Sequence, residues 1–301
     1  MSATVLAPAK APHAPIAAGG KKTVYVEGLL GGLLLGTILA RIFGPRTLVR
    51  DEREVSKVTG TPVLGWIKYA RRKPLLAGDT EGHAGEAFRA LRVNVFALST
   101  ARPRSIVITA SSRGEGATTT AINFALVAAE TGLRVLLVEA NLGQPSAAAY
   151  LQVRGAQGRI AAVSNLGSIA AALRHLPGYA VDVLPAGSTP NPGEVVGSPE
   201  TAEAVATMIA GYDFVVFDAP ALLTSTDAAV LARHSDGVLV VVDTRKTKRR
   251  AFAAATASLH RAGAPLLGVV LNKTPSRPQP RFNRRPRSGA VKPISNAPAR
   301  S

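Results

Sequence analysis

Short apolar runs alternate along the chain with longer stretches of helical character. Five runs are predicted to be buried strands, at residues 105–110, 134–141, 213–220, 237–242 and 266–271. Ala-rich or amphipathic stretches lie between or beside them, among them residues 118–131, 199–210 and 249–262. Alternation of this kind is typical of a parallel sheet with helices on its faces. The pattern therefore predicts a doubly wound, mostly parallel α/β sheet.

A glycine-containing turn joins the first of these strands to the helix that follows, with the sequence Ser111-Ser112-Arg113-Gly114-Glu115-Gly116-Ala117-Thr118-Thr119. A P-loop needs glycines so that backbone N–H groups converge on phosphate, a lysine for the β and γ phosphates, and a Ser or Thr hydroxyl for magnesium. The glycines and Thr118 are present, but Ala117 stands at the lysine position and Ser111 at the first glycine. A degenerate phosphate-binding loop is one interpretation, and a tight turn without a ligand is the other.

Two further strands end in acidic residues, Glu139 and Asp218. Ligands of open parallel sheets bind beyond the carboxyl ends of the strands. Asp218 is therefore predicted to hold a hydrated magnesium ion together with Thr118. The alternative is an aspartate that only caps the next turn.

An apolar stretch of twenty residues, 24–43, lies near the start of the chain, with Glu27 and Arg41 close to its ends. Roughly 20 residues span a bilayer core, so a transmembrane helix is predicted. A buried core helix or a signal peptide is the alternative, but no small-residue cleavage site follows the stretch. Close packing against another membrane helix is predicted from three glycines spaced four apart: Gly28, Gly32 and Gly36.

The net charge is +17, and part of it lies at the C-terminal end. Residues 274–301 carry Arg and Lys but no acidic residue, and are rich in proline. This composition predicts a disordered tail that lies on an anionic membrane surface. Nucleic acid is the rival partner, but no interleaved aromatic residues and no nucleic-acid motif are found, so nucleic-acid binding is not expected. The chain has no cysteine, which excludes disulfides and thiol chemistry.

Taken together, these motifs resemble the bacterial tyrosine kinases (BY-kinases) that are fused to or partnered with polysaccharide chain-length determinants. The resemblance covers about residues 27–273. Beyond the loop and Asp218, it rests on residues 61–65 (TPVLG), 86–92 (EAFRALR), 184–187 (LPAG) and 190–194 (PNPGE). It implies a disordered segment 1–23, a transmembrane helix 24–43, a connector 44–80, a cytoplasmic P-loop domain 81–273 and a basic tail 274–301.

The resemblance also assigns roles to residues. In the family, an E-x-x-R-x-x-R pattern, here Glu86, Arg89 and Arg92, packs each subunit against the next in a ring; a solvated helix face would look the same. Asp218 and Glu139 would be the catalytic residues of an active enzyme, and Thr118 and Asp218 would hold magnesium. Nucleotide contacts are implied for Gly114, Glu115, Gly116, Ala117, Thr118, Thr119 and Asn272.

The departures from the family pattern concern the charged groups. The family P-loop is similar to S-x-P-G-E-G-K-S/T, so Arg113 replaces proline and Ala117 replaces lysine. The second family motif, D-x-D-x-R, is here Glu139-Ala140-Asn141-Leu142-Gly143, and the tail lacks the family's tyrosine cluster. Because phosphoryl transfer depends on positioning and charge stabilisation, little or no transfer is expected, and binding of ATP and magnesium is expected to be weakened or lost.

The functional prediction follows from both the matches and the departures. It is a single-pass membrane protein with a cytoplasmic P-loop domain, a pseudokinase scaffold that regulates biosynthesis or export of a surface polysaccharide. Its expected partners are further copies of itself and a membrane chain-length determinant or polysaccharide export protein. The alternative is an active ATP-dependent tyrosine kinase or ATPase of the same family. A partitioning-type ATPase of the same fold is a third possibility, which the polysaccharide-family motifs disfavour.

Overall fold

The structure is a computed structural model. It describes residues 19–43, 48–70, 83–98, 102–153, 169, 171–186, 193 and 196–275. Its contacts divide the chain into two units, Met1–Thr47 and Leu48–Ser301. The two segments predicted to be disordered, 1–23 and 274–301, lie almost wholly outside the described residues.

The first unit contains one helix, α1 (Gly19–Phe43). Leu29, Leu33 and Leu34 on this helix are each at least 65% exposed. In the described part of the chain, no helix meets the length and apolarity needed to cross a membrane. The transmembrane helix predicted at residues 24–43 is therefore not confirmed.

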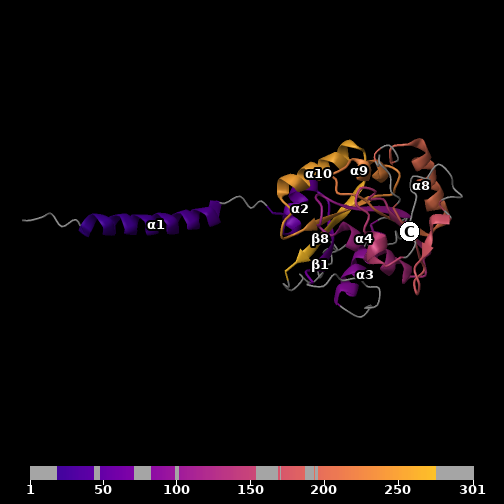
Figure 1. The fold of residues 1–301 in the computed structure, drawn as a ribbon, viewed down its shortest axis with the longest axis horizontal. Helices are drawn as coiled ribbons and strands as arrows, with labels where there is room; N and C mark the ends of the chain where they lie inside the picture. Colours follow the sequence, from indigo (N-terminus) through magenta and orange to yellow (C-terminus); the bar gives the residue numbers. More distant parts are fainter. Residues whose placement is uncertain are drawn as a thin grey trace, which may run out of the picture. The chain divides into compact units, whose positions relative to one another are not determined.

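The second unit is built on a mostly parallel sheet of eight strands, in the order β1-β8-β7-β2-β6-β3-β5-β4 (Figure 1). The strands are β1 (Val63–Lys68), β2 (Ser105–Ala110), β3 (Val135–Glu139), β4 (Arg174–His175), β5 (Val181–Leu184), β6 (Phe214–Asp218), β7 (Val238–Asp243) and β8 (Leu266–Thr274). Only the β4–β5 pair is antiparallel among these strands. The mostly parallel α/β fold is thus confirmed, and the five predicted strands are β2, β3, β6, β7 and β8. Residues 63–68, which the sequence analysis assigned to the connector, form a strand of this sheet.

Helices cover both faces of the sheet. They are α2 (Glu52–Thr59), α3 (His83–Phe96), α4 (Ala117–Ala129), α5 (Ala147–Tyr150), α8 (Pro199–Gly211), α9 (Asp227–Ala232) and α10 (Arg249–Arg261). Side chains of α3, α4 and α5 join one apolar cluster with Ile106 and Ile108, whereas α2, α8, α9 and α10 join another with Val107. Since alternate residues of a strand point to opposite faces, the two clusters are the two sides of one sheet. Its central strands are buried on both sides, which explains their continuous apolar runs.

The strand register brings the candidate residues to one edge. Asp218 pairs with Ile108 on β2 and with Glu139 on β3, and Asp243 pairs with Asn272 on β8. The turn from β2 into α4 starts at this same edge. The carboxyl ends of five strands therefore surround the glycine-containing loop.

Candidate nucleotide site

The β2–α4 loop has the backbone conformation that its glycines permit. Gly114 and Gly116 have φ values of +74° and +109°, and Gly116 is the residue that immediately precedes α4. A Cβ at Gly116 would lie 2.1 Å from Asn272 Nδ2, so no other residue fits there without displacement. The first N–H groups of a helix have no intrahelical partner and attract anions. The loop thus presents a helix N-terminus suited to phosphate.

Glu115 holds the loop from within. It is 1% exposed, and its carboxylate accepts hydrogen bonds from Ser111 N (2.9 Å), Ser112 N (3.1 Å) and Thr247 Oγ1 (2.7 Å). Burial raises the pKa of Glu115, while the hydrogen bond from Thr247 and those from the two backbone N–H groups oppose the rise. The Glu115 carboxylate therefore stabilises the loop itself; its predicted contact with nucleotide stays a prediction.

Three successive loop carbonyls are hydrogen-bonded to side chains from elsewhere in the sheet. Lys246 Nζ donates to Arg113 O (2.8 Å), and Lys273 Nζ donates to Gly114 O (3.0 Å). The amide of Asn272 donates to the next carbonyl, at residue 115 (2.8 Å). Asn272 was predicted to contact nucleotide, and in the structure its amide fixes the loop. Neither lysine was predicted from the sequence, although Lys246 follows β7 and Lys273 lies at the carboxyl end of β8, where ligand-binding residues occur.

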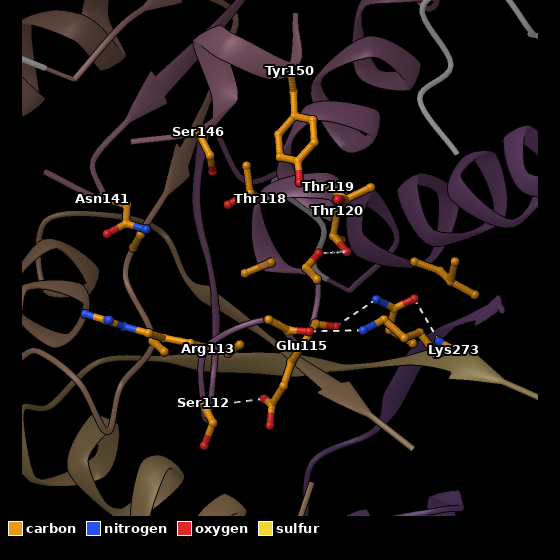
Figure 2. Close-up of a pocket in the computed structure, with 18 of the residues that line it drawn as sticks. Ser112, Arg113, Glu115, Thr118, Thr119, Thr120, Asn141, Ser146, Tyr150 and Lys273 are labelled. Carbon is orange, nitrogen blue, oxygen red and sulfur yellow. Dashed lines mark hydrogen bonds between the residues drawn. The ribbon is translucent and has the colours of Figure 1, made fainter. Parts of the chain in front are cut away.

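A cavity of about 520 Å³ opens beside the loop, within the range of ligand pockets. Figure 2 shows its walls, with Thr118 and Thr119 at the start of α4 and with Asn141, Ser146 and Tyr150 around them. The described residues that line it include every predicted nucleotide contact, from Gly114 to Thr119 and Asn272. Its lining includes neither Glu139 nor Asp218. Backbone, hydroxyl and amide groups line the cavity together with apolar side chains such as Ile67 and Phe88, and its cations include Arg113, Lys68 and Lys273.

Asp218 lies buried behind Thr118, and neither carboxylate oxygen has a hydrogen-bond partner among the described residues. Burial raises its pKa to about 8; the nearby Glu139 carboxylate adds to the rise and Thr118 opposes it. Buried polar atoms without a partner need a water or an ion. A hydrated Mg²⁺ between Thr118 and Asp218 fits this arrangement. Because no group of three or more His, Cys, Asp or Glu side chains is placed to hold a metal in the described chain, phosphate and water oxygens would complete the coordination.

Glu139 is hydrogen-bonded differently from Asp218. One carboxylate oxygen accepts from Ala147 N at the start of α5, and the other from Ala186 N beyond β5 (3.0 Å). Both oxygens are thus bound by backbone N–H groups. The catalytic role expected of Glu139 in an active enzyme stays a prediction, but the contacts seen are structural ones.

The three residues predicted to mediate self-association lie on α3. Arg89 forms a two-point ion pair with Glu130 beyond the end of α4 (Nε–Oε2 2.8 Å, Nη2–Oε1 3.1 Å). Arg92 donates to Val127 O near the same helix end, where positive charge is favoured. Glu86 is 79% exposed at its side chain. Both arginines therefore join α3 to α4, and their role between subunits stays a prediction.

Comparison with known proteins identifies the family of the chain. A family model described as ATPase MipZ matches residues 104–244. The tyrosine-protein kinase YwqD of Bacillus subtilis is 33% identical over 189 residues, which cover 62% of this chain and 80% of YwqD. The putative tyrosine-protein kinase CapB of Staphylococcus aureus is 29% identical over 211 residues, which cover 69% of this chain and 92% of CapB. The crystal structure of the chimerical protein CapA2B2 matches with a TM-score of 0.70 at 28% identity, over 75% of this chain and all of that one.

The fold and the loop define an α/β protein of the P-loop NTPase type. Within that class, the chain belongs to the family of bacterial tyrosine-protein kinases, as the length and identity of the match to YwqD show.

Proposed function

We propose that this chain is a nucleotide-binding, membrane-associated scaffold of the bacterial tyrosine kinase family. It regulates the biosynthesis or export of a surface polysaccharide and has little or no phosphotransfer activity of its own. The polysaccharide role comes from the resemblance of about residues 27–273 to kinases that work with chain-length determinants.

The main support for this proposal is that groups at the positions used for catalysis in the family are replaced or already hydrogen-bonded in this chain. Ala117 cannot neutralise phosphate, Asn141 lines the cavity with a neutral amide, and the Glu139 carboxylate is bound by two backbone N–H groups. Removing a single electrostatic contact in an active site costs about 3 to 4 kcal/mol of transition-state stabilisation. Loss of charge at both Ala117 and Asn141 would therefore reduce an ordinary turnover rate to a very low one.

Nucleotide binding depends on groups that remain. The helix N-terminus at Gly116, the Thr118 hydroxyl and the Asp218 carboxylate, which has no hydrogen-bond partner among the described residues, are groups of the kind that bind phosphate and hydrated Mg²⁺. When bound, Mg²⁺ would neutralise phosphate charge. The same arrangement is the observation that favours the second candidate, an active ATP-dependent tyrosine kinase or ATPase.

Membrane attachment through residues 24–43, with the P-loop domain cytoplasmic, belongs to the proposal. It is supported by the exposed leucines of α1. In this arrangement the chain self-associates, contacts a membrane chain-length determinant or export protein, and uses the basic tail 274–301 on anionic lipid.

The test is Mg-ATP binding and phosphotransfer by the full chain in detergent, beside an Ala117→Lys variant. Binding without turnover in the unaltered chain, with turnover gained in the variant, supports a scaffold. Turnover by the unaltered chain would establish the active kinase or ATPase instead.

A further inference from the structure

Strand β8 carries one extra residue at its carboxyl end. Trp66 of β1 pairs with Leu271 of β8, but Lys68, two residues later, pairs with Thr274, three residues later. The extra residue lies at positions 272–273, and Lys273 has φ +56°. β-bulges re-aim side chains and are frequent next to active sites, and a left-handed conformation is uncommon for a lysine. The backbone of β8 therefore departs from regular geometry at the residue that faces the loop.

The surrounding structure fixes this irregular backbone. The N–H of Lys273 donates to Asn272 Oδ1 (2.8 Å), and its carbonyl accepts from Thr244 Oγ1 (3.1 Å). A strained residue persists only where its neighbours determine its conformation, and such residues concentrate at functional sites. The bulge thus holds the Lys273 side chain in one direction.

The ammonium group of Lys273 lies between the loop and the cavity. It donates to Gly114 O (3.0 Å) and to the buried carboxylate of Asp243 (2.8 Å), and Lys273 lines the cavity. A lysine ammonium has three N–H donors, and these two contacts use two of them. No third partner of this ammonium is found among the described residues, so one donor can serve a phosphate oxygen.

We propose that Lys273 supplies the phosphate site with the positive charge that Ala117 does not provide, by donating its third N–H to the polyphosphate of a bound nucleoside di- or triphosphate. This inference rests on the nucleotide binding proposed above. It gives the loop a cation from the carboxyl end of β8 in place of one from α4.

Two other cations near the loop, Lys246 and Arg113, are less well placed. Lys246 makes the equivalent contact with Arg113 O, but it is exposed and does not line the cavity. Arg113 is exposed, and Figure 2 shows Arg113 and Lys273 on opposite sides of Glu115 in that view. Lys273 combines a held position with access to the cavity, and a compact ammonium suits a phosphate oxygen.

The experiment compares Lys273→Met with Lys246→Met, which removes a matched loop contact outside the cavity. The full chain is titrated calorimetrically with Mg-ATP, Mg-ADP and AMP, and melting temperatures are recorded. Loss of a hydrogen bond to a charged group is expected to weaken ATP and ADP binding by about tenfold to hundredfold in K273M. AMP binding and the affinities of K246M are expected to change by less than about threefold.

A rescue variant separates the charge role from a purely structural one. If Lys273 replaces the loop lysine, adding Ala117→Lys to K273M is expected to restore ADP affinity to within about threefold of the unaltered chain. A structural defect at the bulge would not be repaired from α4. If K273M does not fold, Lys273→Gln, which keeps a donor for Gly114 O, is expected to show the same loss and the same rescue.

Different results would overturn the role of Lys273 alone and the proposed nucleotide binding as a whole. Unchanged ATP and ADP affinity in K273M, an equal loss for AMP, or failure of the rescue would each overturn the role of Lys273 and leave nucleotide binding intact. No binding of any nucleotide by the unaltered chain would overturn both the proposed function and this inference.

Discussion

Glu139 and Asp218 are paired in register at the ends of β3 and β6, yet their carboxylates differ in hydrogen bonding. Glu139 accepts two backbone hydrogen bonds, whereas Asp218 has no partner among the described residues. Here one acid holds two chain segments and the other is available to a hydrated cation.

Replacement of Glu139 is expected to affect stability more than binding. Glu139→Ala leaves two buried N–H groups, those of Ala147 and Ala186, without an acceptor, at about 1 to 3 kcal/mol each. Urea denaturation should therefore show a loss of roughly 2 to 5 kcal/mol, with a smaller loss for Glu139→Gln, which keeps one acceptor oxygen. Glu203→Ala, on an exposed position of α8, is the control. A fully stable E139A protein would show that these bonds contribute nothing.

Asp218 makes the stability of the nucleotide-free protein pH-dependent. Burial raises its pKa from an ordinary 3.8 to about 8 in the folded chain. Between these values the unfolded chain has released the proton and the folded chain has kept it, so stability falls as pH rises, by at most about 1.4 kcal/mol per pH unit. This decrease in stability ends near pH 8. Denaturation midpoints at several pH values should show this slope, and Asp218→Asn should reduce it.

The clearest outcome against the Asp218 assignment would be an identical pH slope in the unaltered chain and in D218N. Glu115, whose pKa burial also raises, contributes a slope of the same sign, so some pH dependence is expected to remain in the variant.

Alanine substitutions at Gly116 and Gly132 distinguish the cost of backbone strain from the cost of a steric clash. Both have positive φ, but a Cβ at Gly132 meets no atom within 4 Å, while one at Gly116 meets the Asn272 amide at 2.1 Å. Gly132→Ala should cost about 1 to 2 kcal/mol of backbone strain. Gly116→Ala should cost at least roughly 1 kcal/mol more, because the bond from Asn272 to the loop is also lost. Thermal denaturation of both variants tests this, and equal losses would argue against the Asn272 contact.

The self-association assigned to the α3 pattern can be tested through its exposed member. Glu86→Lys is expected to reduce the oligomer mass seen by light scattering without changing the melting temperature, since the one ion pair of Glu86 among the described residues is a 3.9 Å contact with Arg89. Arg89→Ala should instead cost about 1 kcal/mol of stability, because it breaks the half-exposed pair with Glu130. Glu203→Lys provides the charge control. Unchanged mass in E86K would remove Glu86 from the interface.

The sequence predicts the fold well because the central strands are buried on both sides and so are continuously apolar. The strands at 105–110 and 237–242 match β2 and β7 to within a residue. Strands β1 and β5 were not predicted: β1 lies at the sheet edge, with Trp66 half-buried and Lys68 exposed, and β5 has only four residues. Their place in the sheet depends on pairing with β8 and β3.

For the site, motif spacing predicts that the loop, Thr118 and Asp218 lie together at one edge of the sheet, and the structure places them there, while their roles stay predictions. It did not find Lys246, Thr247 or Lys273, because their contacts join residues more than 130 positions apart. Glu139 was identified by position, but only the structure shows its carboxylate bound by backbone groups. Contacts of this range carry no local pattern, so sequence periodicity cannot reveal them.

The tie between Asn272 and the loop has a consequence for synthesis of the protein. The carbonyl of Glu115 accepts a hydrogen bond from the amide of Asn272, which is synthesised 157 residues later. At 5 to 20 residues per second, a ribosome needs roughly 8 to 30 s to add that length. During this interval the nascent chain has its glycine turn but lacks the strand that fixes it. The phosphate loop is therefore among the last parts of the domain to reach its final form.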